Sequence, residues 1–149
     1  MRRIILGLVG VALLGVILIT VLALLLETNP PTVKEPPWDS PQTRALAVRA
    51  CFDCHSDQTH WVWWTKLPVG SWLAVFDTLR GRRALNFSEW GVVQPGGEGG
   101  EGGRGGRGVA RVIQNGSMPP STYLLLHPEA VLSDAEKQQL ITGLQNTLK

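Results

Sequence analysis

The chain has 149 residues, which fits one small domain with accessory segments. Removing Arg2 and Arg3 from its 14 Lys and Arg leaves 12, which equals the 12 Asp and Glu. This balance excludes the basic surface of a nucleic-acid-binding protein, so no nucleic-acid partner is expected.

Residues 4–26 form an apolar run without charge or proline. At about 1.5 Å rise per residue, such a helix covers a hydrocarbon core of roughly 30 Å. Arg2 and Arg3 precede the run and the next cation is Lys34, so the positive-inside rule predicts a cytoplasmic N-terminus. We therefore expect residues 1–26 to be a single-pass anchor in the cell membrane that contacts lipid through residues 4–26. The rest of the chain would lie on the extracytoplasmic, periplasmic side.

A cleaved signal peptide is the alternative for this segment. Its apolar region would be about 7–15 residues long and would end in small residues at the cleavage site. Here the run ends in LALLLETNPP, with bulky leucines where small residues are needed, and no cysteine lies nearby for a lipoprotein anchor. The sequence favours an uncleaved anchor.

Residues 27–42 are rich in proline and polar side chains and are predicted to be a semi-extended linker rather than a packed element. Trp38, within this linker, is a candidate for the aromatic belt at a membrane surface. Residues 43–149 are predicted to form one domain. Its segment 95–108, PGGEGGEGGRGGRG, is low in complexity and is predicted to be a flexible loop.

The domain contains only helical patterns, which predicts an all-α fold. Ser40 as N-cap and Pro41 in the first turn start a helix through QTRALAVRACFDCH. A second helix is expected over GSWLAVFDTLRGRRALN, capped by Ser71 and with Gly81 as an unfavourable residue near its end. A short helical stretch, VARVIQNG, follows, and a last helix begins at Ser133 with a capping box to Glu136.

Cys51, Cys54 and His55 form the C-x-x-C-H motif that is typical of c-type haem attachment. Two thiols separated by two residues can each add to one haem vinyl group within a single turn. The imidazole that follows can then reach the iron from the same side. We expect Cys51 and Cys54 to carry one covalent haem c, with His55 as the proximal iron ligand.

Two other interpretations of this motif remain open. A zinc site normally needs four ligands, and a second Cys/His pair is missing, although His60 and His127 could contribute. A thioredoxin-like dithiol is usually found beside a βαβ pattern, which this sequence lacks.

Met118 is the candidate for the distal iron ligand, because it is the only methionine after Met1. Ligation by His and Met raises the reduction potential of a haem, and Pro119 and Pro120 restrict the backbone next to the sulfur. The alternatives are ligation by His127, an empty sixth position, and a methionine that only fills a gap in the core.

Several side chains are candidates for the haem pocket. Tryptophan is abundant near the motif, and Trp61, Trp63, Trp64 and Trp72 are predicted to line the apolar haem crevice; a membrane-interface belt is the alternative for these four residues. Arg83 belongs to an arginine cluster with Arg80 and Arg82. The cluster is either a solvated surface or the source of a bidentate contact to a haem propionate.

These segments together resemble the haem-binding domain family of cytochrome-c-like exported proteins over most of residues 44–143. The resemblance rests on CFDCHSDQTHWVWW, PVGSWL, GRRALNFSEW and GSMPPSTYLLLHPEAVLSDAE. It implies a small all-α monohaem domain, attached through Cys51 and Cys54, with His55 as proximal and Met118 as distal ligand. The glycine-rich segment after Trp90 departs from the family pattern.

The expected function is that of a membrane-anchored monohaem c-type cytochrome that carries single electrons. It is not expected to be an enzyme, because His and Met ligation leaves no open iron position. A membrane redox complex, respiratory or photosynthetic, is the expected partner. Two alternatives remain: a haem-based sensor or peroxidase-like protein with a displaceable sixth ligand, and a haem-bearing structural subunit of a membrane redox complex.

Overall fold

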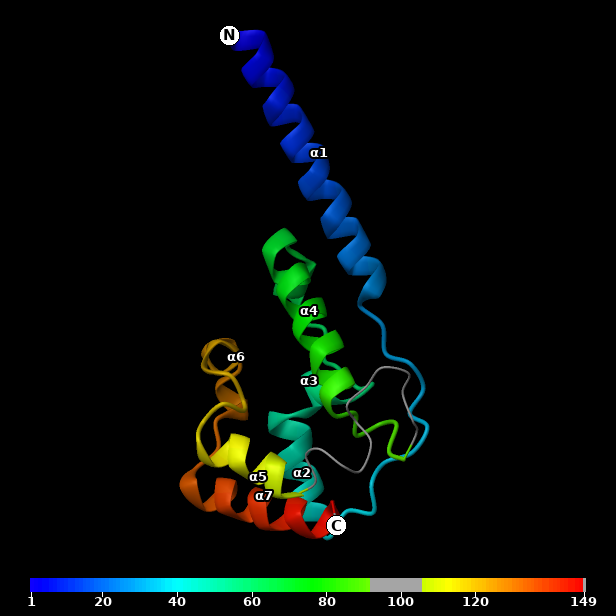
Figure 1. Ribbon diagram of the computed structural model, residues 1–149, viewed down its shortest axis with the longest axis vertical. Coiled ribbons are helices and arrows are strands. Elements are labelled where there is room, and N and C mark those ends of the chain that lie inside the picture. Colours follow the sequence, from blue (N-terminus) through cyan, green and yellow to red (C-terminus); the bar gives the residue numbers. More distant parts are fainter. Residues whose placement is uncertain (92–105, 149) are drawn as a thin grey trace.

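The computed structural model describes residues 1–91 and 106–148, and the predicted all-α fold is confirmed (Figure 1). The elements in chain order are α1 (Arg2–Leu26), α2 (Pro41–Ala50), α3 (Phe52–His55), η1 (Trp63–Lys66), α4 (Pro68–Ala84), α5 (Gly106–Gln114), α6 (Ser121–Leu126), η2 (Pro128–Ala130) and α7 (Asp134–Thr147). Most of the predicted glycine-rich loop, residues 95–105, lies outside the described residues. Its last three positions, 106–108, belong to α5 and not to a loop.

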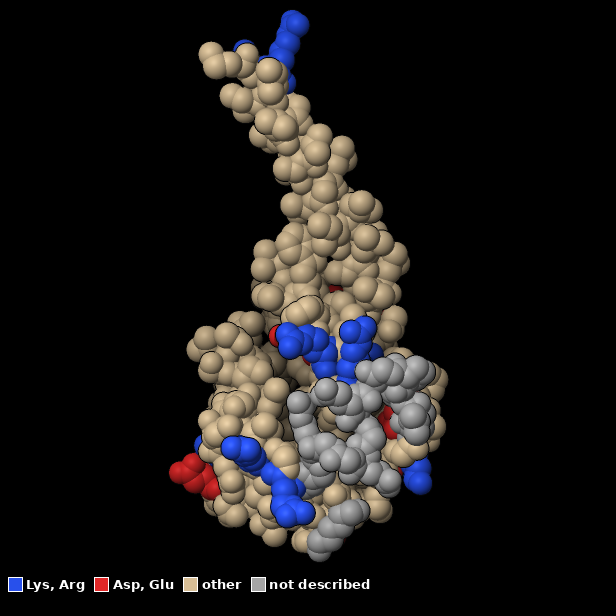
Figure 2. Space-filling view, viewed as in Figure 1, with Lys and Arg blue, Asp and Glu red and all other residues tan. Residues whose placement is uncertain are grey.

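α1 projects from the rest of the molecule as a long uncharged helix, with basic side chains only at its far end, where the sequence has Arg2 and Arg3 (Figure 2). It has 25 residues and is long and apolar enough to cross a membrane. Its C-terminal half lies beside α4 (Figure 1), and Ala23 is buried. The first helix therefore contacts the domain along its side and not only through the connecting chain.

The predicted helix over residues 42–55 is interrupted at Cys51, so the prediction of one continuous helix is wrong. α2 begins as predicted, because the Ser40 hydroxyl accepts a hydrogen bond of 3.2 Å from the Thr43 amide. At Cys51 the backbone leaves the helical conformation, with φ −129° and ψ −32°, and α3 follows. No glycine or proline marks this break, which is why the sequence pattern did not reveal it.

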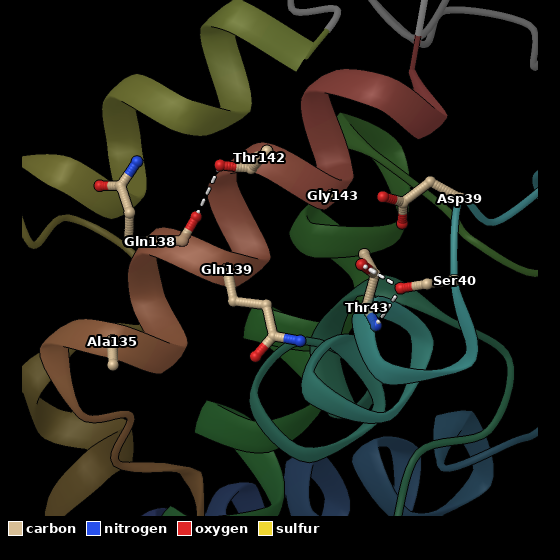
Figure 3. Close-up of a pocket in the computed structure, with 8 residues that line it drawn as sticks. All are labelled: Asp39, Ser40, Thr43, Ala135, Gln138, Gln139, Thr142 and Gly143. Atoms are coloured by element: carbon tan, nitrogen blue, oxygen red, sulfur yellow. Dashed lines mark hydrogen bonds between the residues drawn. The ribbon is translucent and has the colours of Figure 1, made fainter.

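The core lies where α2, α5 and α7 meet. Its buried apolar residues are Leu46, Ala47, Ala50, Phe52, Phe87, Ala110, Ile113, Leu132, Leu140, Ile141, Leu144 and Leu148. α2 and α7 approach closely, because a Cβ on Gly143 would lie 2.0 Å from the Thr43 hydroxyl oxygen. Figure 3 shows the two residues facing each other across this crossing. The predicted capping box between Ser133 and Glu136 begins α7.

Residues 27–42 are largely extended, as predicted, but they pack against the domain, so the prediction of an unpacked linker is wrong. The Ser88 carbonyl accepts hydrogen bonds from the amides of Val33 and Lys34, at 2.9 and 3.0 Å. The Trp90 amide donates to the Lys34 carbonyl at 2.9 Å. Proline removes only its own donor, so the residues between the prolines remain free to pair with residues 88–90.

Trp38 is a packing residue of the domain, so its prediction as a membrane-belt residue is wrong. Its ring lies 5.2 Å from the ring of Phe87 and 6.2 Å from that of Phe52, measured between centroids. Its indole N–H donates to Glu35 at 2.7 Å. An indole has a large apolar ring and one polar N–H, so it suits both the edge of a protein core and a lipid interface, and the sequence alone did not distinguish the two.

α4 begins at Pro68 with Leu67 as its N-cap, four residues before the predicted cap, Ser71. Ser71 is therefore not the cap; it is buried inside the first turn, and its hydroxyl donates to the Pro68 carbonyl at 2.9 Å. Proline is favoured in the first turn because its missing N–H needs no partner there.

Candidate haem site

The C-x-x-C-H turn is held against α4 at Gly81. A Cβ on this glycine would lie 2.2 Å from the Cys54 carbonyl oxygen, so only glycine permits this approach. The His55 amide donates to the Cys51 carbonyl at 2.9 Å, which closes the motif into one turn. The glycine that appeared unfavourable for a helix is therefore the residue that lets α3 and α4 touch.

His55 is oriented by a backbone carbonyl. Its Nδ1 lies 3.0 Å from the Leu85 carbonyl oxygen, which can only accept, so Nδ1 carries the proton and donates. Burial lowers the pKa of His55, against a smaller opposing effect of the Leu85 and Gly81 backbone groups. The ring is therefore neutral, with the lone pair of Nε2 available to a metal, which is the arrangement found in metal-binding histidines.

Cys51 and Cys54 are both unpaired. Burial raises the pKa of Cys51 to about 12, with a further contribution from Cys54. Burial also raises the pKa of Cys54 to about 12, and the Asp77 carboxylate adds to this effect. A redox-active dithiol needs a lowered thiol pKa, so these surroundings do not favour a thioredoxin-like site.

The zinc alternative also finds little support in the part of the chain that the structure describes. Within residues 1–91 and 106–148, no group of three or more His, Cys, Asp or Glu side chains could hold a metal ion. His60 is exposed, and its amide donates to Asp53 at 2.8 Å. His127 is buried, and its Nδ1 lies 3.0 Å from the Tyr123 carbonyl.

Asp53, between the two cysteines, connects the motif to the second half of the domain. One carboxylate oxygen accepts from the His60 amide, and the other accepts from the Tyr123 hydroxyl at 2.8 Å. Its backbone carbonyl accepts from the Thr59 hydroxyl at 2.8 Å. Sequence reasoning missed Asp53 and Tyr123, because the motif treats the residues between the cysteines as variable and no spacing rule links them to α6.

Asp53 is hydrogen-bonded to α6 through Tyr123. The Tyr123 ring stacks on the His127 ring, with centroids 4.0 Å apart and planes at 13°. Trp64 meets His127 edge-on at 5.8 Å. The predicted pocket residue Trp64 and the alternative ligand His127 are therefore neighbours, in one aromatic cluster with Tyr123.

Met118 lies in the connection between α5 and α6. α5 ends at Gln114, and Gly116 follows with φ +72°; its amide donates to the Ile113 carbonyl at 3.2 Å. The Met118 amide donates to the Val112 carbonyl at 3.0 Å, and Pro120 is the N-cap of α6. The Met118 side chain is 39 % exposed, so it does not serve as a gap-filling core residue. Because α6 is hydrogen-bonded to Asp53, this connection is tied to the cysteine-histidine turn.

The other predicted pocket tryptophans have different environments. The Trp61 indole N–H donates to Asn29 at 3.2 Å. Trp72 is half-buried, and its indole nitrogen is buried with no hydrogen-bond partner among the described residues. Trp63, a candidate for the crevice or for the belt, is exposed.

The arginines separate into different roles. Arg82 is the inward-facing member: its Nε donates to the Ser56 carbonyl at 2.8 Å and lies 3.4 Å from the Asp57 carboxylate. Arg80 lies over the Phe76 ring at 5.1 Å. Arg83 is exposed, so its predicted propionate contact stays a prediction.

A shallow groove between α2 and α7, lined by residues of mostly polar type, is separate from this site (Figure 3). It is lined by Asp39, Ser40, Thr43, Ala135, Gln138, Gln139, Thr142 and Gly143. None of these eight residues is a cysteine, histidine or methionine, so the groove offers no soft ligand for a haem iron.

The donor set around α3 fits a haem. A neutral imidazole with a free Nε2 and two unpaired thiols on the same turn are groups that attach and ligate such a cofactor. No curated protein and no solved structure matches the chain. The sequence pattern of the haem-binding domain matches residues 14–146, which is most of the chain. The chain therefore belongs to the haem-binding domain family.

Proposed function

We propose that this haem protein is a membrane-anchored c-type cytochrome that carries single electrons on the extracytoplasmic side of a membrane. The observation that carries the proposal is the His55 side chain, whose Nδ1 proton is donated to the Leu85 carbonyl. This bond leaves Nε2 unprotonated and fixes the plane of the ring. When bound, a haem supplies a reversible one-electron iron couple.

Cys51 and Cys54 would hold the group through two thioether bonds. Both thiols are unpaired and lie on one turn beside His55, which supports attachment and axial ligation from the same segment. Thioether bonds need no thiolate in the finished protein, so the apolar surroundings of the two sulfurs suit them.

Met118 would be the second axial ligand. Its position in an exposed connection that Tyr123 and Asp53 tie to α3 supports this role. With two protein ligands the iron would have no free position for a substrate, so the proposed role is electron transfer and not catalysis. A thioether ligand also favours a raised reduction potential.

α1 would anchor the domain in the cell membrane, with the N-terminus in the cytoplasm. Its length, its apolar surface and the two arginines before it support this orientation. The proposed partner is a membrane redox complex, respiratory or photosynthetic, because a tethered carrier meets such complexes within the plane of the membrane.

The test is a redox-titrated absorption spectrum of the full chain, produced in a host that attaches haem c. We expect a haem stain on the denatured band and a low-spin oxidised spectrum with a thioether-to-iron charge-transfer band. The double substitution Cys51→Ala and Cys54→Ala should abolish the stain, whereas His60→Ala, at the exposed neighbouring histidine, should not. A stain that survives the double substitution would refute covalent attachment.

One observation favours a second candidate function. Met118 is 39 % exposed in a connection between two short helices, which suits a ligand that an external molecule displaces. A haem-based sensor or peroxidase-like protein would then result. Rapid binding of CO to the reduced wild-type protein, with a high-spin oxidised spectrum, would favour this function over electron transfer.

A further inference from the structure

We propose that residues 61–76 insert into the outer leaflet of the same bilayer that α1 crosses, so that the domain sits in the lipid surface and not above it. We call these residues, which include η1 and the first half of α4, the immersed segment. The inference rests on the membrane anchoring of α1 proposed above. The occupant of its exposed face is therefore phospholipid.

The depth of the segment follows from its contact with α1. Residues 4–26 rise about 35 Å as a helix, only about one turn more than a hydrocarbon core of roughly 30 Å. α4 begins beside the C-terminal half of α1 (Figure 1), where Ala23 is buried and Thr20 half-buried. Since so little of α1 can lie outside the bilayer, the start of α4 must lie at the depth of the lipid chains.

The surface of the immersed segment suits lipid. Its exposed large apolar side chains are Trp63, Leu67, Val69, Leu73 and Phe76. Trp63 is 76 % exposed and Val69 is 62 % exposed. Figure 2 shows that the uncharged surface of α1 continues onto the part of the domain next to it. A cluster of this kind next to a spanning helix is typical of an interfacial segment.

The one charge in the segment is neutralised. Lys66 is the only charged residue in WVWWTKLPVGSWLAVF, and it forms an ion pair with Glu27, the first residue after α1. The Glu27 side chain is only 1 % exposed, which is compatible with a lipid boundary only because a cation faces it. Lys66 itself can extend its flexible stem toward the headgroups.

Charge reappears immediately after the segment. Asp77, Arg80 and Arg83 are exposed on the next two turns of α4, and Figure 2 shows basic side chains gathered where the uncharged helix meets the domain. This change marks the level of the headgroups, where arginine can bind lipid phosphates. Gly81, which touches the cysteine-histidine turn, lies only five residues beyond Phe76, or about 7.5 Å along the helix. The candidate haem site would therefore lie at the membrane surface, within reach of membrane-embedded partners.

Photolabelling from the lipid tests this arrangement. The full-length holoprotein is reconstituted into palmitoyl-oleoyl-phosphatidylcholine vesicles that contain a phospholipid with a diazirine on its acyl chain, and adducts are mapped by mass spectrometry. We expect adducts on residues 4–26 and on residues 61–76. Adducts on residues 4–26 alone would refute the insertion of residues 61–76 and leave the anchoring by α1 intact. Water, a second copy of the chain or another protein would then cover the segment. The absence of adducts from both ranges would overturn both proposals.

A matched pair of variants sharpens the test. Val69→Asp places a charge on the immersed face, and Val131→Asp places the same charge at an exposed valine outside it. We expect Val69→Asp to lower the adduct yield on residues 61–76 at least fivefold, with unchanged labelling of residues 4–26 and an unchanged haem spectrum. Val131→Asp should leave both yields as in the wild type. Equal yields in the two variants would refute the proposal.

Discussion

The Tyr123 hydroxyl donates a hydrogen bond of 2.8 Å to the carboxylate of Asp53, a residue 70 positions earlier in the chain. Asp53 lies between Cys51 and Cys54, and Tyr123 lies on the helix that follows Met118. The bond therefore joins the segment that would attach the haem to the segment that would supply its distal ligand. The apolar surroundings and the carboxylate both raise the pKa of Tyr123, with burial the larger effect, so the phenol stays protonated and able to donate.

We predict that Tyr123→Phe lowers the free energy of unfolding by about 1 kcal/mol, the usual net contribution of one partly buried hydrogen bond. Covalent haem should remain, because the cysteines are untouched, but the Met118 connection should open more often. The measurement is urea unfolding together with the rate of CO binding to the reduced protein. Thr122→Ala, at the exposed neighbour on α6, is the control. Wild-type stability and CO binding in Tyr123→Phe would show that the bond does not hold this connection.

Met118→Ala should leave haem covalently attached and lower the reduction potential, because a thioether stabilises the reduced iron. The thioether charge-transfer band should disappear, and CO should bind readily. His127→Ala is the informative comparison, because His127 is the rival ligand and is buried beside Tyr123. If His127→Ala changes the potential and Met118→Ala does not, the distal ligand has been assigned to the wrong residue.

Gly81→Ala should destabilise the domain by about 1–3 kcal/mol, because its new Cβ would meet the Cys54 carbonyl at 2.2 Å. The Cys54 carbonyl belongs to the backbone and cannot rotate away from the new Cβ as a side chain could. α3 and α4 must therefore separate. The yield of covalent haem should fall, because the cysteine-histidine turn is displaced. Gly10→Ala, where nothing lies within 4 Å, is the matched control in α1. Full haem loading and wild-type stability of Gly81→Ala would contradict the close approach.

The features that sequence reasoning predicted depend on a few neighbouring residues. The capping box of Ser133 and Glu136, the Ser40 cap and the apolar helix α1 are all local, and each is present. The C-x-x-C-H spacing is local as well, and it led to the family that the chain belongs to. Such features follow from the geometry of one turn and need no knowledge of the remaining fold.

The features that it missed depend on which distant segments meet. Trp38 was predicted to lie in a membrane belt because it is in the linker that follows the anchor, yet its ring packs on Phe87. Gly81 was judged by its helix propensity, whereas its position is set by the Cys54 carbonyl. A single sequence does not show which distant residues are in contact, so the contact between Asp53 and Tyr123 could not be predicted either.

Stability should depend on pH through Glu35, which fixes residues 27–42 to α2. The Arg44 guanidinium donates to both carboxylate oxygens at 2.6 Å and lowers the pKa of Glu35 to about 2 from an ordinary value of 4.5. Because the pKa of Glu35 is lower in the folded protein than in the unfolded chain, its ionised form stabilises the fold. This contribution is complete above about pH 4.5, the unfolded pKa, and is lost as the pH falls toward 2, the folded pKa. Because Arg44 is partly exposed, solvent screening limits the contribution to about 1 kcal/mol.

Glu35→Gln should therefore lower the free energy of unfolding at pH 7 by about 1 kcal/mol and have little effect near pH 2. The difference between variant and wild type should shrink across the interval from pH 4.5 to pH 2, as measured by urea unfolding at several pH values. Glu129→Gln, at an exposed glutamate in η2, is the control and should follow the wild type throughout. A difference that stays constant with pH would mean that Glu35 acts through its packing and its hydrogen bond from Trp38, and not through its charge.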